Sequence, residues 1–136
     1  MNSMSGMTKF ETIAVLGAGS WGSALANVAA RAGRTTSLGG RDKTHIRDIT
    51  LARENTRYLP GIALEDGVNP VGNLSCVTAA DAVLLVVPAQ AQRETAASIA
   101  DLIRPHVPVI ICAKGIERQT RMFMSEAVSQ ALPQSP

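Results

Sequence analysis

A glycine-rich segment near the start of the chain has the spacing of a phosphate-binding turn. It reads Gly17-Ala-Gly-Ser-Trp-Gly22 and fits the pattern G-x-G-x-x-G. In such a segment the first glycine permits a tight turn, the second leaves room for a pyrophosphate, and the third lets a helix pack close to a sheet. These roles fall to Gly17, Gly19 and Gly22. The pyrophosphate would meet the N–H groups that open the next helix; a glycine turn without a ligand is the alternative.

The residues after the next apolar segment bear on the choice of nucleotide. About 20 positions beyond the glycine segment, sites for NAD carry a carboxylate that holds the ribose 2′-hydroxyl. This window reads Ser37-Leu-Gly-Gly-Arg41, with Arg41 where an acid would stand. A guanidinium suits the 2′-phosphate of NADP. The adjacent Asp42 is a carboxylate, so NAD stays an alternative cofactor. The sequence therefore favours NADP over NAD.

Apolar and helical segments alternate along the chain, which predicts an α/β fold: a doubly wound (Rossmann-type) parallel sheet with helices on both faces. The predicted strands cover residues 12–16, 35–38, 68–71, 82–87 and 107–112. The predicted helices cover 23–32, 43–53, 90–103 and 118–132, and Asn73 could cap a short helix through Thr78. The glycine segment thus joins the first strand to the first helix, the context that favours nucleotide binding.

Composition narrows the class of protein further. Only four of the 136 residues are aromatic, so the core must consist of Ala, Val, Leu and Ile. No apolar run approaches the roughly 20 residues that span a bilayer, and no secretory signal is visible. Cys76 and Cys112 lie in apolar contexts typical of reduced core thiols, so we expect a cytoplasmic protein; a disulfide is the alternative.

Positive charge is concentrated in one part of the chain. Residues 31–57 hold seven basic and three acidic side chains, whereas the net charge of the whole chain is only +2. This pattern favours a small anion over nucleic acid, which would need stacking aromatics and a long basic stripe. A solvated helix face is the alternative. We expect both histidines, His45 and His106, at the surface, and no metal site.

Five segments in a fixed order carry a resemblance to a known family. They are IAVLGAGSWGSALA (13–26), GGRD (39–42), ENTRYLPGI (54–62), ADAVLLVVPAQAQR (80–93) and CAKGIE (112–117). Together they resemble the amino-terminal domain of bacterial NAD(P)-dependent glycerol-3-phosphate dehydrogenase. The resemblance implies reversible hydride transfer between NAD(P)H and dihydroxyacetone phosphate, which gives sn-glycerol 3-phosphate for phospholipid synthesis.

The resemblance also implies roles for single residues. Ser20 and Trp21 match loop residues that contact the cofactor, Arg41 matches a residue at the adenosine ribose or its phosphate, and Tyr58 matches a residue near the cofactor. Lys114 matches a lysine that binds substrate oxygens beside the nicotinamide. Lys114 also follows the last predicted strand, at the sheet edge where ligands bind, and there a lysine can stabilise negative charge on a ketone oxygen.

Members of the family are more than twice as long as this chain. We expect residues 1–10 to be a disordered or tag-like extension and 11–136 to be the NAD(P)-binding domain, without the helical carboxyl-terminal domain that carries the family's general-base lysine. We therefore expect cofactor binding with little turnover, and the uncovered apolar surface would favour a homo-oligomer. Two alternatives stay open: a non-catalytic nucleotide-binding module, and a dehydrogenase for another hydroxy or keto substrate, against which Lys114 argues.

Overall fold

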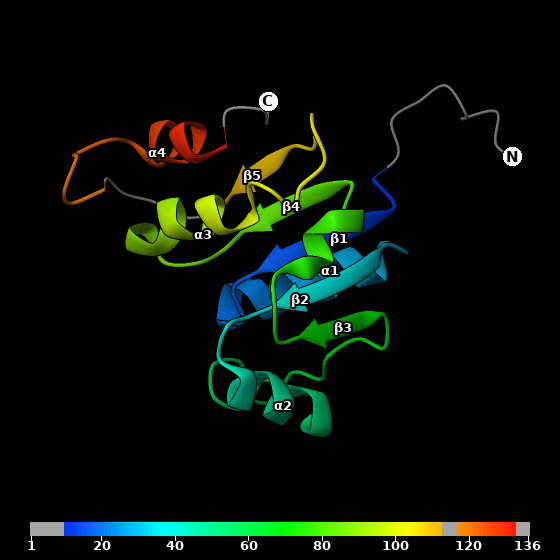
Figure 1. The fold of residues 1–136 in the computed structure, drawn as a ribbon. Coiled ribbons are helices and arrows are strands. Elements are labelled where there is room, and N and C mark those ends of the chain that lie inside the picture. The colour runs from blue at the N-terminus through cyan, green and yellow to red at the C-terminus, as the bar shows by residue number, and fades with distance from the viewer. Residues whose placement is uncertain (1–9, 113–116, 133–136) are drawn as a thin grey trace, which may run out of the picture.

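The computed structural model describes residues 10–112 and 117–132, and it contains a sheet in which all pairings are parallel. The strands are β1 (Thr12–Leu16), β2 (Thr35–Gly39), β3 (Val68–Val71), β4 (Ala82–Leu85) and β5 (Val109–Ile111). Their spatial order is β3-β2-β1-β4-β5, and Figure 1 shows them side by side with all arrowheads toward the same edge. The predicted parallel α/β sheet is confirmed, with β1 at its centre.

Helices cover both faces of this sheet. They are α1 (Ser20–Arg31), α2 (Lys43–Ala52), α3 (Gln92–Ile99) and α4 (Met124–Ala131), with short 3-10 helices η2 (Ser75–Ala79) and η3 (Ala89–Ala91). Helix α1 contacts β1 and β2, α2 contacts β3, and α3 packs against α4. In Figure 1, α2 lies beyond β3, while α3 and α4 lie together near β4 and β5.

Two apolar clusters form the core, one on each face of the sheet. Neighbouring residues of β1 divide between them: Ile13 and Val15 join one cluster, and Ala14 and Leu16 join the other. Successive side chains of a strand point to opposite faces, so a strand covered on both faces needs a continuous apolar run. The core is aliphatic, as the composition predicts.

The boundaries of three helices were predicted wrongly. Helix α1 begins at Ser20, three residues before the predicted start, because the end of the glycine segment is already helical. Helix α3 ends at Ile99, where turn hydrogen bonds replace the helical ones. Helix α4 begins only at Met124, because the Glu126 carboxylate accepts from the Phe123 N–H at 3.3 Å and Phe123 is the N-cap.

Smaller differences occur at strand ends and at the short helix. Strand β4 ends at Leu85, two residues before the end of the predicted range. Strand β5 begins at Val109, after a proline that cannot donate to the ladder. The segment after Asn73 is a 3-10 helix, and the Asn73 side chain accepts from the Ser75 N–H at 2.9 Å. These changes leave the sheet order intact.

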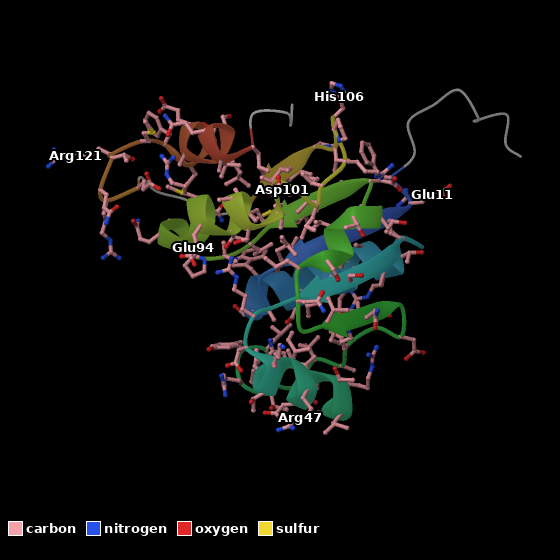
Figure 2. The ribbon with its side chains drawn as sticks, viewed as in Figure 1. Glu11, Arg47, Glu94, Asp101, His106 and Arg121 are labelled. Atoms are coloured by element: carbon pink, nitrogen blue, oxygen red, sulfur yellow. The ribbon has the colours of Figure 1, made fainter. Side chains whose placement is uncertain are left out.

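One carboxylate anchors the amino-terminal edge of the sheet. The Asp81 side chain accepts from the Thr12 N–H at 2.9 Å, the Glu11 N–H at 3.0 Å and Arg104 Nη2 at 2.9 Å. The backbone bond from Thr12 is the main cause that lowers the pKa of Asp81 below its ordinary value, and Arg104 adds to it. In Figure 2, Glu11 lies at the edge away from the arrowheads. Asp81 thus fixes the start of β1.

No helix in residues 10–112 and 117–132 combines the length and the apolar character needed to cross a membrane.

Candidate functional site: a cleft at the carboxyl edge of the sheet

A cleft of about 600 Å³ opens where β1 and β4 end. Its walls come from the glycine segment, from the stretch after β4 and from two segments that follow β2. The lining residues are Gly17, Ala18, Gly19, Ser20, Trp21, Gly22, Asp42, His45, Arg57, Tyr58, Val86, Val87, Pro88, Ala89 and Cys112. The chain crosses from one side of β1 to the other at this point, and open α/β sheets bind ligands in that crevice.

The three glycines of the motif meet three different demands. Gly17 has φ +119°, and a Cβ there would lie 2.8 Å from the Val86 carbonyl carbon. A Cβ at Gly22 would lie only 1.6 Å from the Gly17 carbonyl oxygen, so α1 could not approach the turn. A Cβ at Gly19 would meet no atom within 4 Å, and therefore the space in front of Gly19 is open to a ligand. This arrangement fits a dinucleotide pyrophosphate.

Two buried side chains hold the backbone of the glycine segment from behind. His45 Nε2 lies 2.9 Å from the Ala18 carbonyl oxygen and must carry the proton to donate to it. Asn55 Nδ2 donates to the same oxygen at 3.0 Å and to Ser23 Oγ at 2.8 Å. His45 is 7% exposed and Asn55 1%. The Ala18 carbonyl is thus fixed toward the protein interior by two donors.

This carbonyl orientation sets the direction of the next N–H group. The described chain contains no cis peptide bond, and in a trans peptide the C=O and the following N–H point in opposite directions. With the Ala18 oxygen bonded to His45 and Asn55, the Gly19 N–H points away from these two side chains. The two side chains therefore fix the orientation of a backbone donor in a residue that lines the cleft.

The amino end of α1 continues this donor surface. Gly19 is the N-cap residue, no side chain caps the helix, and its first turn holds no acidic residue. The first N–H groups of a helix have no intrahelical acceptor and carry the positive end of its dipole. Ser20 and Trp21 of this turn line the cleft, so their N–H groups are available to an anion.

Four side chains from the start of α2 and from the stretch after it line the same cleft as Trp21. Asp42 caps α2 by accepting from the His45 N–H at 3.1 Å, and its carboxylate lies 3.8 Å from the Arg57 guanidinium. The Tyr58 ring meets the His45 ring edge-on, with centroids 5.3 Å apart, and Arg57 lies 5.8 Å from the Tyr58 centroid. This cluster places one cation and one aromatic ring beside the phosphate-binding turn.

A second, smaller pocket adjoins the first. It measures about 170 Å³ and shares Gly17, Val87 and Pro88 with the first cleft. Its other lining residues come from the ends of β1 and β2, from the residue before η2 and from the α3 region: Leu16, Gly39, Gly40, Arg41, Leu74, Ala91 and Thr95. A dinucleotide with its pyrophosphate at Gly19 would extend its adenosine toward the end of β2.

Most of the predicted site residues fall in these two hollows. Gly17, Gly19, Ser20, Trp21, Gly22 and Tyr58 line the first, and Arg41 lines the second. Trp21 is 70% exposed and Tyr58 50%. Lys114 lies outside the described residues; its neighbour Cys112 lines the first cleft as an uncharged group, since burial raises the pKa of the thiol. No group of three or more His, Cys, Asp or Glu side chains within the described part could hold a metal ion.

Two residues of the site were missed from the sequence. The expectation that His45 is a surface residue was wrong, whereas His106 is exposed as expected. His45 stands four positions before Ile49, on one face of a helix, and that spacing could have indicated burial. Asn55 lies in the ENTRYLPGI segment, but no local pattern indicates that its amide reaches Ala18.

The basic segment 31–57 serves several roles. Arg41 and Arg57 line the hollows. Lys43 and Arg47 are exposed on α2, as in the alternative of a solvated face, and Figure 2 shows Arg47 away from the sheet. Arg53 instead donates to the Glu65 and Val68 carbonyl oxygens at 2.7 and 3.1 Å. The solvated face therefore accounts for part of the segment, and attraction of a small anion by Arg41 and Arg57 stays a prediction.

A glycine turn between the central strand and the first helix of a parallel sheet ordered 3-2-1-4-5 defines a Rossmann-type nucleotide-binding domain. Comparison with known proteins gives the family. Residues 12–136 match the family described as NAD-dependent glycerol-3-phosphate dehydrogenase N-terminus, and the chain belongs to that family. The domain is its amino-terminal, NAD-binding one, and it covers nearly the whole chain.

Individual relatives agree with this assignment. The chain is 50% identical over 127 residues to a glycerol-3-phosphate dehydrogenase (NAD(P)+) of Azorhizobium caulinodans, which covers 93% of the chain and 39% of the relative. It is 46% identical over 131 residues to that of Chelativorans sp., covering 96% of the chain and 40% of the relative. The crystal structure of glycerol-3-phosphate dehydrogenase from Coxiella burnetii superposes with a TM-score of 0.85 at 31% identity, over 92% of this chain and 38% of that one. The chain thus spans about two fifths of the length of these relatives.

Proposed function

We propose that this chain binds NAD(P)(H), with the pyrophosphate at the amino end of α1. The observation that carries the proposal is the double hydrogen bond from His45 and Asn55 to the Ala18 carbonyl, which fixes the Ala18–Gly19 peptide beside the cleft. We infer that the Gly19 N–H then faces the ligand. Backbone donors fixed before a ligand arrives need no reorganisation on binding. The helix dipole and the nearby Arg57 add positive potential for the two phosphates.

The remaining cleft residues would contact the rest of the cofactor. Ser20 and Trp21 would contact the pyrophosphate side, with Tyr58 near the same end of the molecule. Arg41 would meet the adenosine ribose, and its charge favours the 2′-phosphate of NADP over NAD. The bound nicotinamide supplies or accepts the hydride in the family's chemistry.

We propose for the whole protein the reversible reduction of dihydroxyacetone phosphate to sn-glycerol 3-phosphate, in the synthesis of glycerophospholipids. Support comes from the family and from relatives whose name states this dehydrogenase activity. Lys114 would bind substrate oxygens beside the nicotinamide. Residues 11–136 would form the cofactor domain, and the free thiols Cys76 and Cys112 accord with a reducing, cytoplasmic location.

The 136-residue chain alone is expected to turn over little substrate. General acid–base catalysis needs a group within hydrogen-bond reach of the reacting atoms. In the described cleft the His45 ring is engaged by Ala18 and the Asp42 carboxylate by the cap of α2. His45 thus holds the glycine segment and Asp42 holds the start of α2, so we assign both a structural role.

A fluorescence titration tests cofactor binding. Trp21 is the only tryptophan in the chain, so its emission reports on the cleft without a label. NADH and NADPH should each change the emission saturably, with the tighter binding for NADPH. An emission that does not respond to either nucleotide, together with no heat in calorimetry, would contradict the proposal. Reduction of dihydroxyacetone phosphate at the rate of a full-length relative would contradict the expectation of little turnover.

A further inference from the structure

The pocket at the end of β2 has a second wall, which comes from α3. Gly39, Gly40 and Arg41 form one side of it, and Ala91 and Thr95 lie on the other. Helix α3 follows β4, which is separated from β2 by β1. A nucleotide in this pocket would therefore contact side chains from α3 as well as from the end of β2.

Arg41 bridges the two walls. Its Nη1 donates to Glu94 Oε1 at 2.9 Å and its Nη2 donates to Ser98 Oγ at 2.7 Å. Glu94 and Ser98 stand four residues apart on one face of α3, and Ser98 Oγ in turn donates to the Glu94 carbonyl oxygen at 2.9 Å. The Arg41 side chain is 49% exposed and that of Glu94 73%. The guanidinium thus already has a carboxylate partner, in a pair that remains open to solvent.

The Glu94 carboxylate should affect the binding of NADP(H) and NAD(H) differently. The 2′-phosphate of NADP(H) is a strong bidentate partner for a guanidinium, but it would have to displace Glu94 or share Arg41 with a second anion. NAD(H) has an uncharged 2′-hydroxyl at this position and can bind with the Arg41–Glu94 pair intact. The Arg41–Glu94 pair therefore disfavours binding of the 2′-phosphate of NADP(H) and leaves binding of the 2′-hydroxyl of NAD(H) unaffected.

We propose that Glu94 is a specificity-determining residue, which competes with the 2′-phosphate of NADP(H) for Arg41. The acid that NAD sites carry at the end of the second strand is absent from the sequence there. Helix α3 supplies a carboxylate at this place from 53 residues further along the chain. Glu94 thereby reduces the preference that Arg41 gives to NADP(H). This inference rests on the proposed function, because it needs the cofactor in the cleft.

The test compares dissociation constants for NADPH and NADH in the 136-residue chain and four variants. Glu94→Gln removes the charge and should tighten NADPH about threefold, which is within the strength of an exposed ion pair. NADH should bind as in the parent. Arg41→Ala should weaken NADPH, and Glu94→Gln should bring no gain in the Arg41→Ala background.

A matched control separates the local pair from overall charge. Asp101 is an exposed carboxylate just beyond α3, and Figure 2 shows it further from the arrowhead edge of the sheet than Glu94. Asp101→Asn makes the same change in net charge and should leave both constants unchanged. Thermal melts of each variant check that α3 is still folded, because Glu94 also lies in its first turn.

The outcomes distinguish this inference from the proposal on which it rests. If the parent binds neither nucleotide, both fail. If Arg41→Ala weakens NADPH but Glu94→Gln does not tighten it, the competition is refuted and cofactor binding stands. A gain that persists without Arg41, or that Asp101→Asn reproduces, would also refute competition through Arg41.

Discussion

The side chains that support the two hollows of the binding surface differ in how deeply they are buried. At the glycine segment, hydrogen bonds from His45 and Asn55 to the Ala18 carbonyl do the positioning, and both side chains are almost fully buried. At the end of β2, the Arg41–Glu94 pair consists of charged groups that are about half or more exposed. The turn that forms the first hollow is thus held by buried side chains, whereas the ion pair at the second lies where solvent reaches it.

This difference in burial separates two properties of a cofactor site: the ability to bind a dinucleotide and the choice between dinucleotides. Buried hydrogen bonds to a backbone carbonyl are costly to break and little affected by salt. They fix the donors that any dinucleotide pyrophosphate needs. Exposed ion pairs are weak and screened by salt, so they can be exchanged with little cost to stability. We infer that the glycine end determines whether a dinucleotide binds and the Arg41 end influences which one.

The largest effect is expected at Gly22. In Gly22→Ala the new Cβ would lie 1.6 Å from the Gly17 carbonyl oxygen, and backbone atoms cannot move aside as a flexible side chain can. We expect a loss of about 3 kcal/mol or more in the free energy of unfolding, measured by urea denaturation. A variant that unfolds at the urea concentration of the parent would show that α1 does not need this close approach.

Gly19→Ala should separate binding from stability. A Cβ at Gly19 meets no atom within 4 Å, and alanine in place of glycine at an N-cap should cost no more than about 1 kcal/mol of stability. The methyl group would occupy the position of the pyrophosphate, so we expect at least a tenfold rise in the dissociation constant for NADH, about 1.4 kcal/mol. Calorimetry on the folded variant measures it. Unchanged affinity would place the pyrophosphate elsewhere.

Asn55→Ala tests the support behind the loop. It removes the donor to the Ala18 oxygen and to Ser23 Oγ from a residue that is 1% exposed. We expect a loss of about 2 kcal/mol in stability, as for a buried hydrogen-bonding group left unpaired, and weaker binding of both NADH and NADPH. Asn73→Ala is the matched control, because within the described part of the chain its side chain bonds to the exposed Ser75 alone. If Asn55→Ala bound both nucleotides as the parent does, the loop would hold its shape without Asn55.

A smaller effect is expected at the opposite edge of the sheet. Asp81→Asn weakens the anchor of β1 and should cost about 1 kcal/mol of stability at neutral pH, with cofactor binding unchanged. The pKa of Asp81 is lowered in the folded state, so its contribution is present above the ordinary value of about 3.8 and is lost as the pH falls through the folded value. Urea denaturation of parent and variant should therefore converge in acid. A difference that is constant down to low pH would contradict the assigned ionisation.

The sequence predicted well what depends on local pattern. Strand β1 follows from its apolar run, and the turn after it follows from the spacing of the glycines. The place of Arg41 follows from its distance after that turn. The start of α4 was predicted too early because residues that favour a helix already precede it in the sequence. The actual start depends on the hydrogen bond from the Phe123 N–H to the Glu126 carboxylate. The periodicity of apolar residues does not indicate where such a cap begins the helix.

The contacts that give the site its character join residues far apart in the chain. His45 reaches the Ala18 carbonyl across 27 positions and Asn55 across 37. Glu94 reaches Arg41 across 53. Each of these residues looks like an ordinary polar side chain of its own segment, and only the sheet order brings the partners together. Sequence patterns identify the backbone of the site, whereas its support and its charge balance come from tertiary structure.

The measurement that tests the central claim most directly is an NMR titration of the ¹⁵N-labelled chain with NADH. The claim is that His45 and Asn55 aim the Gly19 N–H at a dinucleotide pyrophosphate. We predict that the amide signals of Gly19 and Ser20 show the largest saturable shifts, downfield as for new hydrogen bonds to phosphate. Saturation with those two signals unmoved, or no saturable shift at all, would contradict it.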